Sequence, residues 1–125
     1  MIDLRAVALA LLLAMSAAPA SAQDCPGATS NDDCDRIRFE KVDGELTRAV
    51  EARLTQIDRR STLVDKVERA KSTFSAAQRQ WLQFREAECR AQAAFEILIS
   101  ARTLNALTAG CLNSLTRRRI EEISR

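Results

Sequence analysis

This 125-residue sequence contains four cysteines, and their number alone indicates their chemistry. They are Cys25, Cys34, Cys89 and Cys111. An even number of cysteines in a small exported domain is typical of two disulfides, and four cysteines can pair in three ways. A zinc site would need closely spaced cysteine pairs or histidines, and the sequence has no C-x-x-C pair and no histidine. We therefore expect two disulfides, with no metal ion and no cofactor.

The remaining polar residue types do not combine into a catalytic set. Without histidine, no Ser-His or Cys-His pair can activate a nucleophile. Carboxylates such as Glu86 and Glu88, or Glu121 and Glu122, lie one or two residues apart, and such positions do not face each other on a helix. No glycine-rich phosphate loop is present. The sequence predicts a protein that is not an enzyme.

The first 22 residues have the composition of a secretory signal peptide. Arg5 precedes an apolar run over residues 6–15, and Ala20-Ser21-Ala22 is an A-x-A cleavage pattern. The run of about ten residues is too short to cross a bilayer. Cleavage after Ala22 would leave residues 23–125 as one domain with no transmembrane segment. We expect a periplasmic or secreted protein.

Lipidation of Cys25 is the alternative use of this amino-terminal region. Lipoprotein signals carry small residues before the lipidated cysteine, whereas Asp24 precedes Cys25. Lipidation would also leave an odd number of cysteines for pairing. We therefore expect Cys25 to form a disulfide.

Apolar residues recur at helical spacing in three stretches, so the element pattern is all-α. The expected helices cover about 32–60, 63–97 and 103–123, and short turns between them predict an up-down-up antiparallel three-helix bundle. Ser30 is a candidate N-cap for the first helix, and Thr62-x-x-Asp65 a candidate capping box for the second. Several apolar positions are expected in the core: Ile37, Val42, Leu46, Val50, Leu54, Ile57, Leu63, Val67, Ala70, Phe74, Leu104, Leu107, Cys111, Leu115 and Ile123.

The second helix carries the only tryptophan, and the rest of the chain is expected to pack around it. Ala77, Trp81 and Phe84 lie on one stripe at steps of four and three residues. Tryptophan offers a large apolar area, so Trp81 and Phe84 are predicted to be core residues. The stripe is flanked by Gln78, Arg79, Arg85 and Glu86, to which we assign structural roles. Arg85 is expected to stack on an aromatic ring or to pair with a carboxylate of another helix.

The bundle topology constrains the disulfides without deciding between two pairings. Cys34 and Cys89 are almost equally far from Ser61 in the first turn, and Cys89 and Cys111 are equally far from Ser100 in the second. We favour nested pairing, Cys34 with Cys89 and Cys25 with Cys111. The sequential pairing, Cys25 with Cys34 and Cys89 with Cys111, fits the second turn equally well.

The formal net charge of +2 indicates no particular polyanionic partner. The densest cationic cluster is Arg117-Arg118-Arg119, which suits a solvated helix end. Export argues against nucleic acid as its partner. Arg117 and Arg118, with Arg102 on the second turn, are the candidate contacts for an acidic protein partner or a membrane surface.

Three motifs carry a resemblance to a known family. Residues 42–47 read VDGELT, residues 77–89 read AQRQWLQFREAEC, and the last motif comprises CL at 111–112 and LTRRR at 115–119. The chain resembles the domain named for the lysozyme inhibitor LprI over nearly all of its predicted mature length. The sequence departs from the family pattern at Thr47, at Glu86 and at residues 98–101, where LISA replaces the usual Gly-Gly-Ser.

The resemblance implies an exported helical domain that binds a protein, with inhibition of lysozyme as the activity of some members. One hypothesis is therefore occlusion of the lysozyme cleft, in which Arg102 would meet the catalytic carboxylates. The alternative is an envelope interaction module that binds another protein and has no effect on lysozyme.

Overall fold

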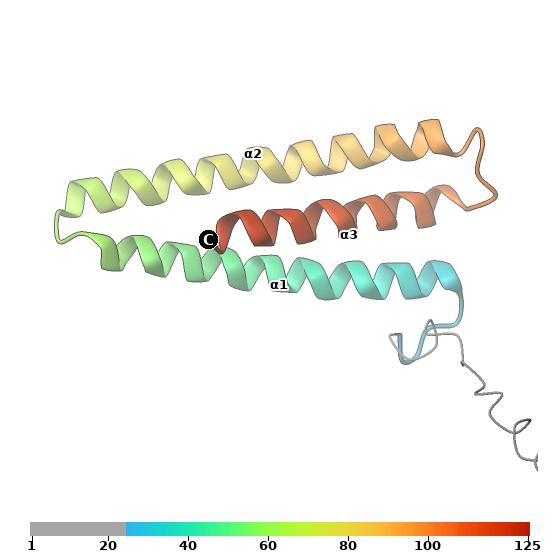
Figure 1. Ribbon diagram of the computed structural model, residues 1–125, viewed down its shortest axis with the longest axis horizontal. Helices are drawn as coiled ribbons and strands as arrows, with labels where there is room; N and C mark the ends of the chain where they lie inside the picture. The colour runs from blue at the N-terminus through green and yellow to red at the C-terminus, as the bar shows by residue number, and fades with distance from the viewer. Residues whose placement is uncertain (1–24) are drawn as a thin grey trace, which may run out of the picture.

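The computed structural model describes residues 25–125 and contains three α-helices. They are α1 (Asn31–Arg60), α2 (Val64–Glu96) and α3 (Leu104–Ile123). They run up, down and up, as predicted, and α3 lies between α1 and α2 in Figure 1. The predicted signal peptide at 1–22 lies outside the described residues and stays a prediction.

Side-chain caps fix the starts of two helices. The Ser30 Oγ accepts a 3.1 Å hydrogen bond from the Asp33 N–H, which confirms the predicted N-cap of α1. Thr103 caps α3 in the same way by accepting from the Ala106 N–H. The predicted capping box at Thr62 is wrong, because α2 has Leu63 as its N-cap and no side-chain cap bond.

The third helix holds the bundle together. It packs on α1 most extensively and on α2 next, whereas α1 and α2 contact each other least. Figure 1 shows α3 ending short of the turn between α1 and α2, so only the end of the molecule beyond α3 is a two-helix hairpin. At 1.5 Å per residue, the 33 residues of α2 extend over about 50 Å, which is roughly the length of the molecule.

The buried apolar core is small and consists of short side chains. Its largest aliphatic members come from α1 and α3, and the full set outside the cysteines is Val42, Leu46, Ala93, Ala106, Leu107, Leu112 and Ile123. Among the predicted core positions, Leu104 is wrong because it is half-exposed, and Leu63 is likewise exposed beside the first turn. Leu112 and Thr116 occupy the buried face of α3 instead of Cys111 and Leu115, which are partly buried.

The inward stripe of α2 differs from the one that apolar spacing predicts. Gln78, Arg85 and Cys89 are buried on it, while Ala77 is exposed and Phe84 is 53% exposed. The prediction that Phe84 is a core residue is therefore wrong. Apolar periodicity missed the stripe because two of its buried positions hold polar side chains, which are stabilised by partners on the other helices.

Two disulfides are present, and their pairing is sequential. Cys25 bonds to Cys34, and Cys89 bonds to Cys111. The favoured nested pairing is wrong because α1 and α2 barely touch, so Cys89 meets the cysteine of α3. A turn over residues 25–28 places Cys25 beside the start of α1. In this turn Gly27 has φ +87°, and the Ala28 N–H donates to the Cys25 carbonyl. With its sulfur in a disulfide, Cys25 has no thiol left for a lipid.

Candidate functional site

A buried arginine on α2 connects all three helices. Arg85 is 5% exposed, and its Nη1 donates to Asp43 Oδ1 of α1 at 2.6 Å and to Thr116 Oγ1 of α3 at 3.1 Å. Its Nη2 donates to Glu86 Oε1 at 2.9 Å. The guanidinium also lies 5.1 Å from the centre of the Phe39 ring, so both expected roles of Arg85, stacking and ion pairing, are present.

The tryptophan of α2 lies beside this arginine and beside a second one. The guanidinium carbons of Arg85 and Arg119 lie 5.5 and 5.6 Å from the ring centre of Trp81. Arg119 Nε also donates to Gln78 Oε1 at 3.0 Å, and its Nη1 donates to Glu122. Trp81 is partly buried, and its ring is a contact surface for these two cations within the chain.

These contacts form one polar network whose members come from all three sequence motifs. The polar network comprises Asp43, Gln78, Trp81, Arg85, Glu86, Thr116 and Arg119. Its hydrogen bonds join α1 to α2 and α2 to α3, and its central members are buried. The buried residues of the motifs that carry the resemblance therefore hold the three helices in register.

Exposed apolar side chains gather at the end of the molecule where α2 passes into α3. Leu98 and Ile99 are 76% and 85% exposed, and they have exposed neighbours of the same kind. We define the loop apex as Phe95, Ile97, Leu98, Ile99 and Leu104. A cluster of large apolar residues in water is typical of a surface that binds a partner.

Apolar periodicity does not predict the loop apex, because residues 98–102 fall in the turn between two expected helices. The available signal was the composition of that turn. Ile97, Leu98 and Ile99 are consecutive aliphatic residues in a segment that is not helical, and the family's Gly-Gly-Ser is replaced there. Turns are normally built from small and polar residues.

The loop is fastened to the first helix by its polar side chains. Arg102 donates to Asp35 Oδ2 and to the Ala106 carbonyl, each at 3.2 Å. Thr103 donates to Asp32 Oδ2 at 2.8 Å. The loop apex is therefore presented on an anchored loop, and Arg102 stands half-exposed beside it.

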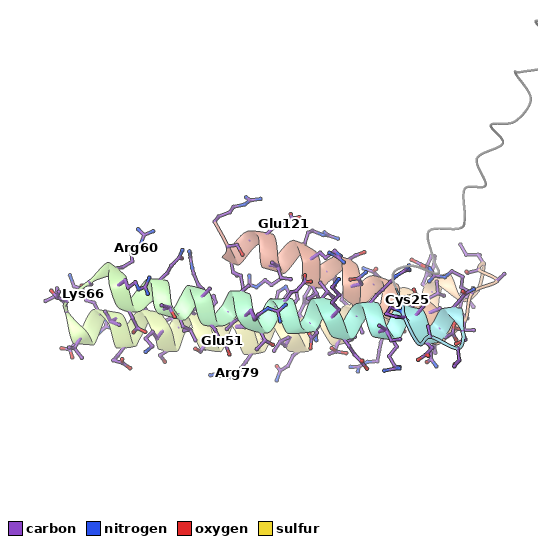
Figure 2. The ribbon with its side chains drawn as sticks, turned by 90° about the horizontal axis from the view of Figure 1, so that it is seen from below. Cys25, Glu51, Arg60, Lys66, Arg79 and Glu121 are labelled. Atoms are coloured by element: carbon purple, nitrogen blue, oxygen red, sulfur yellow. A yellow bond between two sulfur atoms is a disulfide. The ribbon has the colours of Figure 1, made fainter. Side chains whose placement is uncertain are left out.

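Of the other cations named from the sequence, Arg118 lines an open groove between α2 and α3 that Arg102 also lines. Arg117 and Arg118 are both exposed on α3. Arg79 is exposed as well and points away from the bundle (Figure 2). Among the described residues, Arg102 is the only one of these four that lies beside the loop apex.

Charge is divided unevenly along the molecule. The half that bears the loop apex, residues 31–45 and 84–116, contains nine Asp and Glu against six Lys and Arg. The opposite half, residues 46–83 and 117–125, contains six Asp and Glu against twelve Lys and Arg. The first half is formally −3 and the second +6, and we call them the acidic half and the basic half.

One carboxylate of the acidic half has a shifted proton affinity. The hydrogen bond from Arg36, and a second from the Thr29 N–H, hold the pKa of Asp33 below its usual value. Its side chain is 23% exposed and is held by these two donors at the start of α1, so it is not placed for proton transfer to a bound substrate. Within residues 25–125 no group of His, Cys, Asp or Glu is arranged to hold a metal ion, and no helix there is apolar enough over its length to span a membrane.

Comparison with known proteins identifies the family. No curated protein and no solved structure matches the chain. The model of the family described as lysozyme inhibitor LprI matches residues 20–123, which is most of the sequence. Two disulfides and this match point to an extracytoplasmic, non-enzymatic binding protein. The chain belongs to the lysozyme inhibitor LprI family.

Proposed function

We propose that this protein is an exported inhibitor that binds lysozyme and occludes its cleft with the loop apex. The observation that carries the proposal is the cluster of exposed aliphatic side chains at the acidic end of the molecule. The loop is convex and anchored to α1, and a lysozyme cleft is concave, so the two shapes are complementary. An anchored loop also loses little conformational freedom on binding, which favours affinity.

Burial of the loop apex supplies the main driving force. Fully burying one Leu or Ile side chain contributes about 1.5 to 3 kcal/mol. Leu98 and Ile99 are almost fully exposed in the free protein, so burial of both side chains by a partner would contribute nearly this full amount to the free energy of binding. Large apolar side chains that enter a pocket at the centre of an interface typically dominate binding.

The charge distribution supports lysozyme as the partner. Animal-type lysozymes are cationic, and a net charge of +2 on the inhibitor would give no attraction between the two molecules as a whole. The half that carries the loop apex is nevertheless negative, and two of its carboxylates, Asp32 and Asp35, contact the base of the loop. The acidic half would therefore face the cationic enzyme during encounter.

Arg102 provides the complementary charge for the cleft itself. A lysozyme cleft carries two catalytic carboxylates, which a guanidinium can bind. In the free protein Arg102 is paired with Asp35 at 3.2 Å, and the arginine is half-exposed. Asp35 has Arg38 at 3.9 Å as a second cation, and Thr103 keeps the loop bonded to Asp32, so Arg102 can exchange Asp35 for a carboxylate of the enzyme while the loop stays anchored.

Lysis of bacterial cell walls, followed by turbidity with and without the purified protein, tests the proposal. The unaltered protein should slow lysis, and Leu98→Ser combined with Ile99→Ser should raise the half-maximal inhibitory concentration at least about tenfold. Arg102→Gln should raise it about threefold to tenfold, because one charge-assisted contact is lost.

The matched control is Leu63→Ser combined with Val64→Ser, which removes two exposed aliphatic side chains from the opposite end. This variant should inhibit as strongly as the unaltered protein. Equal losses in both double variants would contradict assignment of inhibition to the loop apex. An absence of inhibition by the unaltered, correctly folded protein would favour the alternative, an envelope module that binds a different protein.

Export to the periplasm or the medium is part of the same proposal. The predicted signal peptide at 1–22 should be removed, leaving Gln23 as the first residue. Mass spectrometry of the exported protein measures this directly. An intact Met1 or a lipid on Cys25 would contradict it.

A further inference from the structure

The end of the molecule opposite the loop apex has a second cluster of exposed aliphatic residues, and this one is surrounded by cations. Leu63 and Val64, at the turn between α1 and α2, are 55% and 71% exposed. Arg59, Arg60 and Lys66 are exposed on either side of them. We call these five residues the hairpin apex, and Figure 2 shows Arg60 and Lys66 at the end of the molecule away from Cys25.

The cations of the hairpin apex are not neutralised by neighbouring carboxylates. Asp58 lies 3.1 Å from Lys71, and Glu68 lies 3.9 Å from the same amine. Within residues 25–125, no ion pair involves the cations nearest the turn, which are Arg59, Arg60, Lys66 and Arg69. Between residues 58 and 71, the one other carboxylate is Asp65. The apex therefore presents an excess of positive charge around two aliphatic side chains.

A groove continues from the hairpin apex along the face between α1 and α2. Its lining includes the cations Arg53, Arg60 and Lys66 and the apolar residues Ile57 and Val67. No residue of α3 lines this groove, and the chain after α3 contacts it through the backbone oxygen of Arg125, which accepts a 2.9 Å hydrogen bond from Arg53. An anionic headgroup can lie between the cations while the adjoining hydrocarbon contacts the apolar residues.

We propose that the hairpin apex docks on the surface of a bilayer that contains anionic phospholipid. Arg59, Leu63 and Val64 lie outside the groove, so the apex as a whole suits an extended, deformable surface better than a small ligand confined to the groove. Basic residues beside a lipid surface each contribute to attraction, and exposed aliphatic side chains enter the boundary between headgroups and acyl chains. This combination of a cationic ring and an aliphatic tip distinguishes a membrane surface from a soluble polyanion, which would use the cations alone.

Sedimentation with vesicles tests this proposal on the exported chain. The protein should bind vesicles of mixed phosphatidylglycerol and phosphatidylcholine, should not bind phosphatidylcholine alone, and should dissociate as salt is raised. Arg60→Gln combined with Lys66→Gln should weaken binding about twentyfold to thirtyfold, taking about fivefold for each charge. Leu63→Ser combined with Val64→Ser should weaken it at least about tenfold.

Matched control variants remove the same numbers of cationic and aliphatic side chains away from the hairpin apex. Arg48→Gln combined with Arg79→Gln deletes two exposed cations away from the turn, and Leu98→Ser combined with Ile99→Ser deletes two aliphatic side chains at the opposite end. Both should bind vesicles as the unaltered protein does, apart from a small effect of the lost charge, with helical circular dichroism unchanged in every variant. Equal binding to both vesicle types would overturn the proposal.

Two further outcomes would assign the hairpin apex to another partner and so overturn the proposal. One is binding to soluble polyglutamate with the same affinity as to vesicles and with no effect of the Leu63 and Val64 substitutions. The other is self-association in vesicle-free solution that the same substitutions abolish, which would assign the surface to a second copy of the chain. None of these outcomes depends on inhibition of lysozyme.

Discussion

Arg85 occupies a position on α2 where a helix of this size would ordinarily bury an aliphatic residue. Moving a charge out of water is costly unless it is paired and hydrogen-bonded. The cost is limited here because Asp43 and Glu86, its carboxylate partners, remain 43% exposed at the side chain and are partly solvated by water. The planar guanidinium also lies 5.1 Å from the Phe39 ring centre and 5.5 Å from that of Trp81, contacts that a lysine amine does not reproduce in the same geometry.

Replacement of Arg85 by lysine should therefore destabilise the protein although the charge is kept. The variant loses at least one of the contacts to Asp43, Thr116 and Glu86, together with the stacking. We expect the free energy of unfolding to fall by about 1 to 3 kcal/mol. Urea titration measures it, with Arg79→Lys as the exposed control on the same helix. Equal stability of the two variants would contradict a structural role for the polar network.

At the start of α1, the lowered pKa of Asp33 predicts a pH dependence of stability. Because the folded-state pKa lies below the ordinary value near 3.8, the carboxylate stabilises the fold above that pH. This contribution is lost as the pH falls through the folded-state pKa. Asp33→Asn should be less stable than the unaltered protein at neutral pH, and the difference should disappear in acid.

Urea titrations at neutral pH and near pH 3 measure this difference in unfolding free energy. Glu51→Gln, which removes an exposed carboxylate with no ion pair among the described residues, is the control. A difference between Asp33→Asn and the unaltered protein that persists unchanged at low pH would show that the charge of Asp33 does not contribute.

At the scale of helices, the sequence predicts where each helix begins and ends better than it predicts which face of the helix is buried. Helix bounds agree with the expected ones to within about two residues, because caps, turn composition and apolar spacing are local signals. Which side of α2 faces inward depends on partners from α1 and α3. No local pattern indicates that Gln78 and Arg85 are buried while Phe84 is exposed.

The residues of the candidate site are the least predictable from the sequence, because their exposure also depends on how the helices pack. A family resemblance directs attention to Trp81 and Arg85, yet the structure places these residues in the polar network. The exposed surface lies at Leu98 and Ile99, where the sequence departs from the family pattern. Whether an aliphatic residue in a turn is covered by another element can be judged only once the three helices are placed.

The two disulfides should contribute unequally to stability. Cys89–Cys111 closes a segment of 22 residues and Cys25–Cys34 one of nine. Chain-entropy reasoning gives about 3.5 and about 2.5 kcal/mol respectively. Replacing Cys89 and Cys111 by alanine should therefore lower the free energy of unfolding more than replacing Cys25 and Cys34.

Urea titration of the two double variants measures this order, and peptide mapping without reduction checks the pairing itself. Peptides that join Cys34 to Cys89 would contradict the sequential arrangement. A larger loss from the Cys25 and Cys34 substitutions would show that the amino-terminal turn contributes packing beyond its short loop.

At the scale of the whole molecule, the two proposed surfaces lie at opposite ends of one long hairpin. The loop apex belongs to the acidic half and the hairpin apex to the basic half. α2 runs from one to the other, so about 50 Å separates them. Electrostatic screening lengths in physiological salt are about 8 Å, so neither end influences ligand binding at the other through its charge.

Inhibition of lysozyme by vesicle-bound protein should therefore equal inhibition by free protein, if both proposals hold. A hairpin apex fixed on the bilayer leaves the loop apex directed into solution. Adding anionic vesicles should change the half-maximal inhibitory concentration by less than about twofold, because the two ends are farther apart than several screening lengths. A soluble oligosaccharide substrate makes the measurement independent of turbidity, and lysozyme with vesicles alone corrects for adsorption of the cationic enzyme.

The variant with Leu63→Ser and Val64→Ser is the control for this measurement, since it should stay in solution and inhibit equally with and without vesicles. The informative comparison is the unaltered protein under conditions where sedimentation shows it fully bound. Loss of its inhibition there, with the control unaffected, would mean that the membrane covers the loop apex. The molecule would then lie flat on the bilayer, and the separation of functions between its two ends would be wrong.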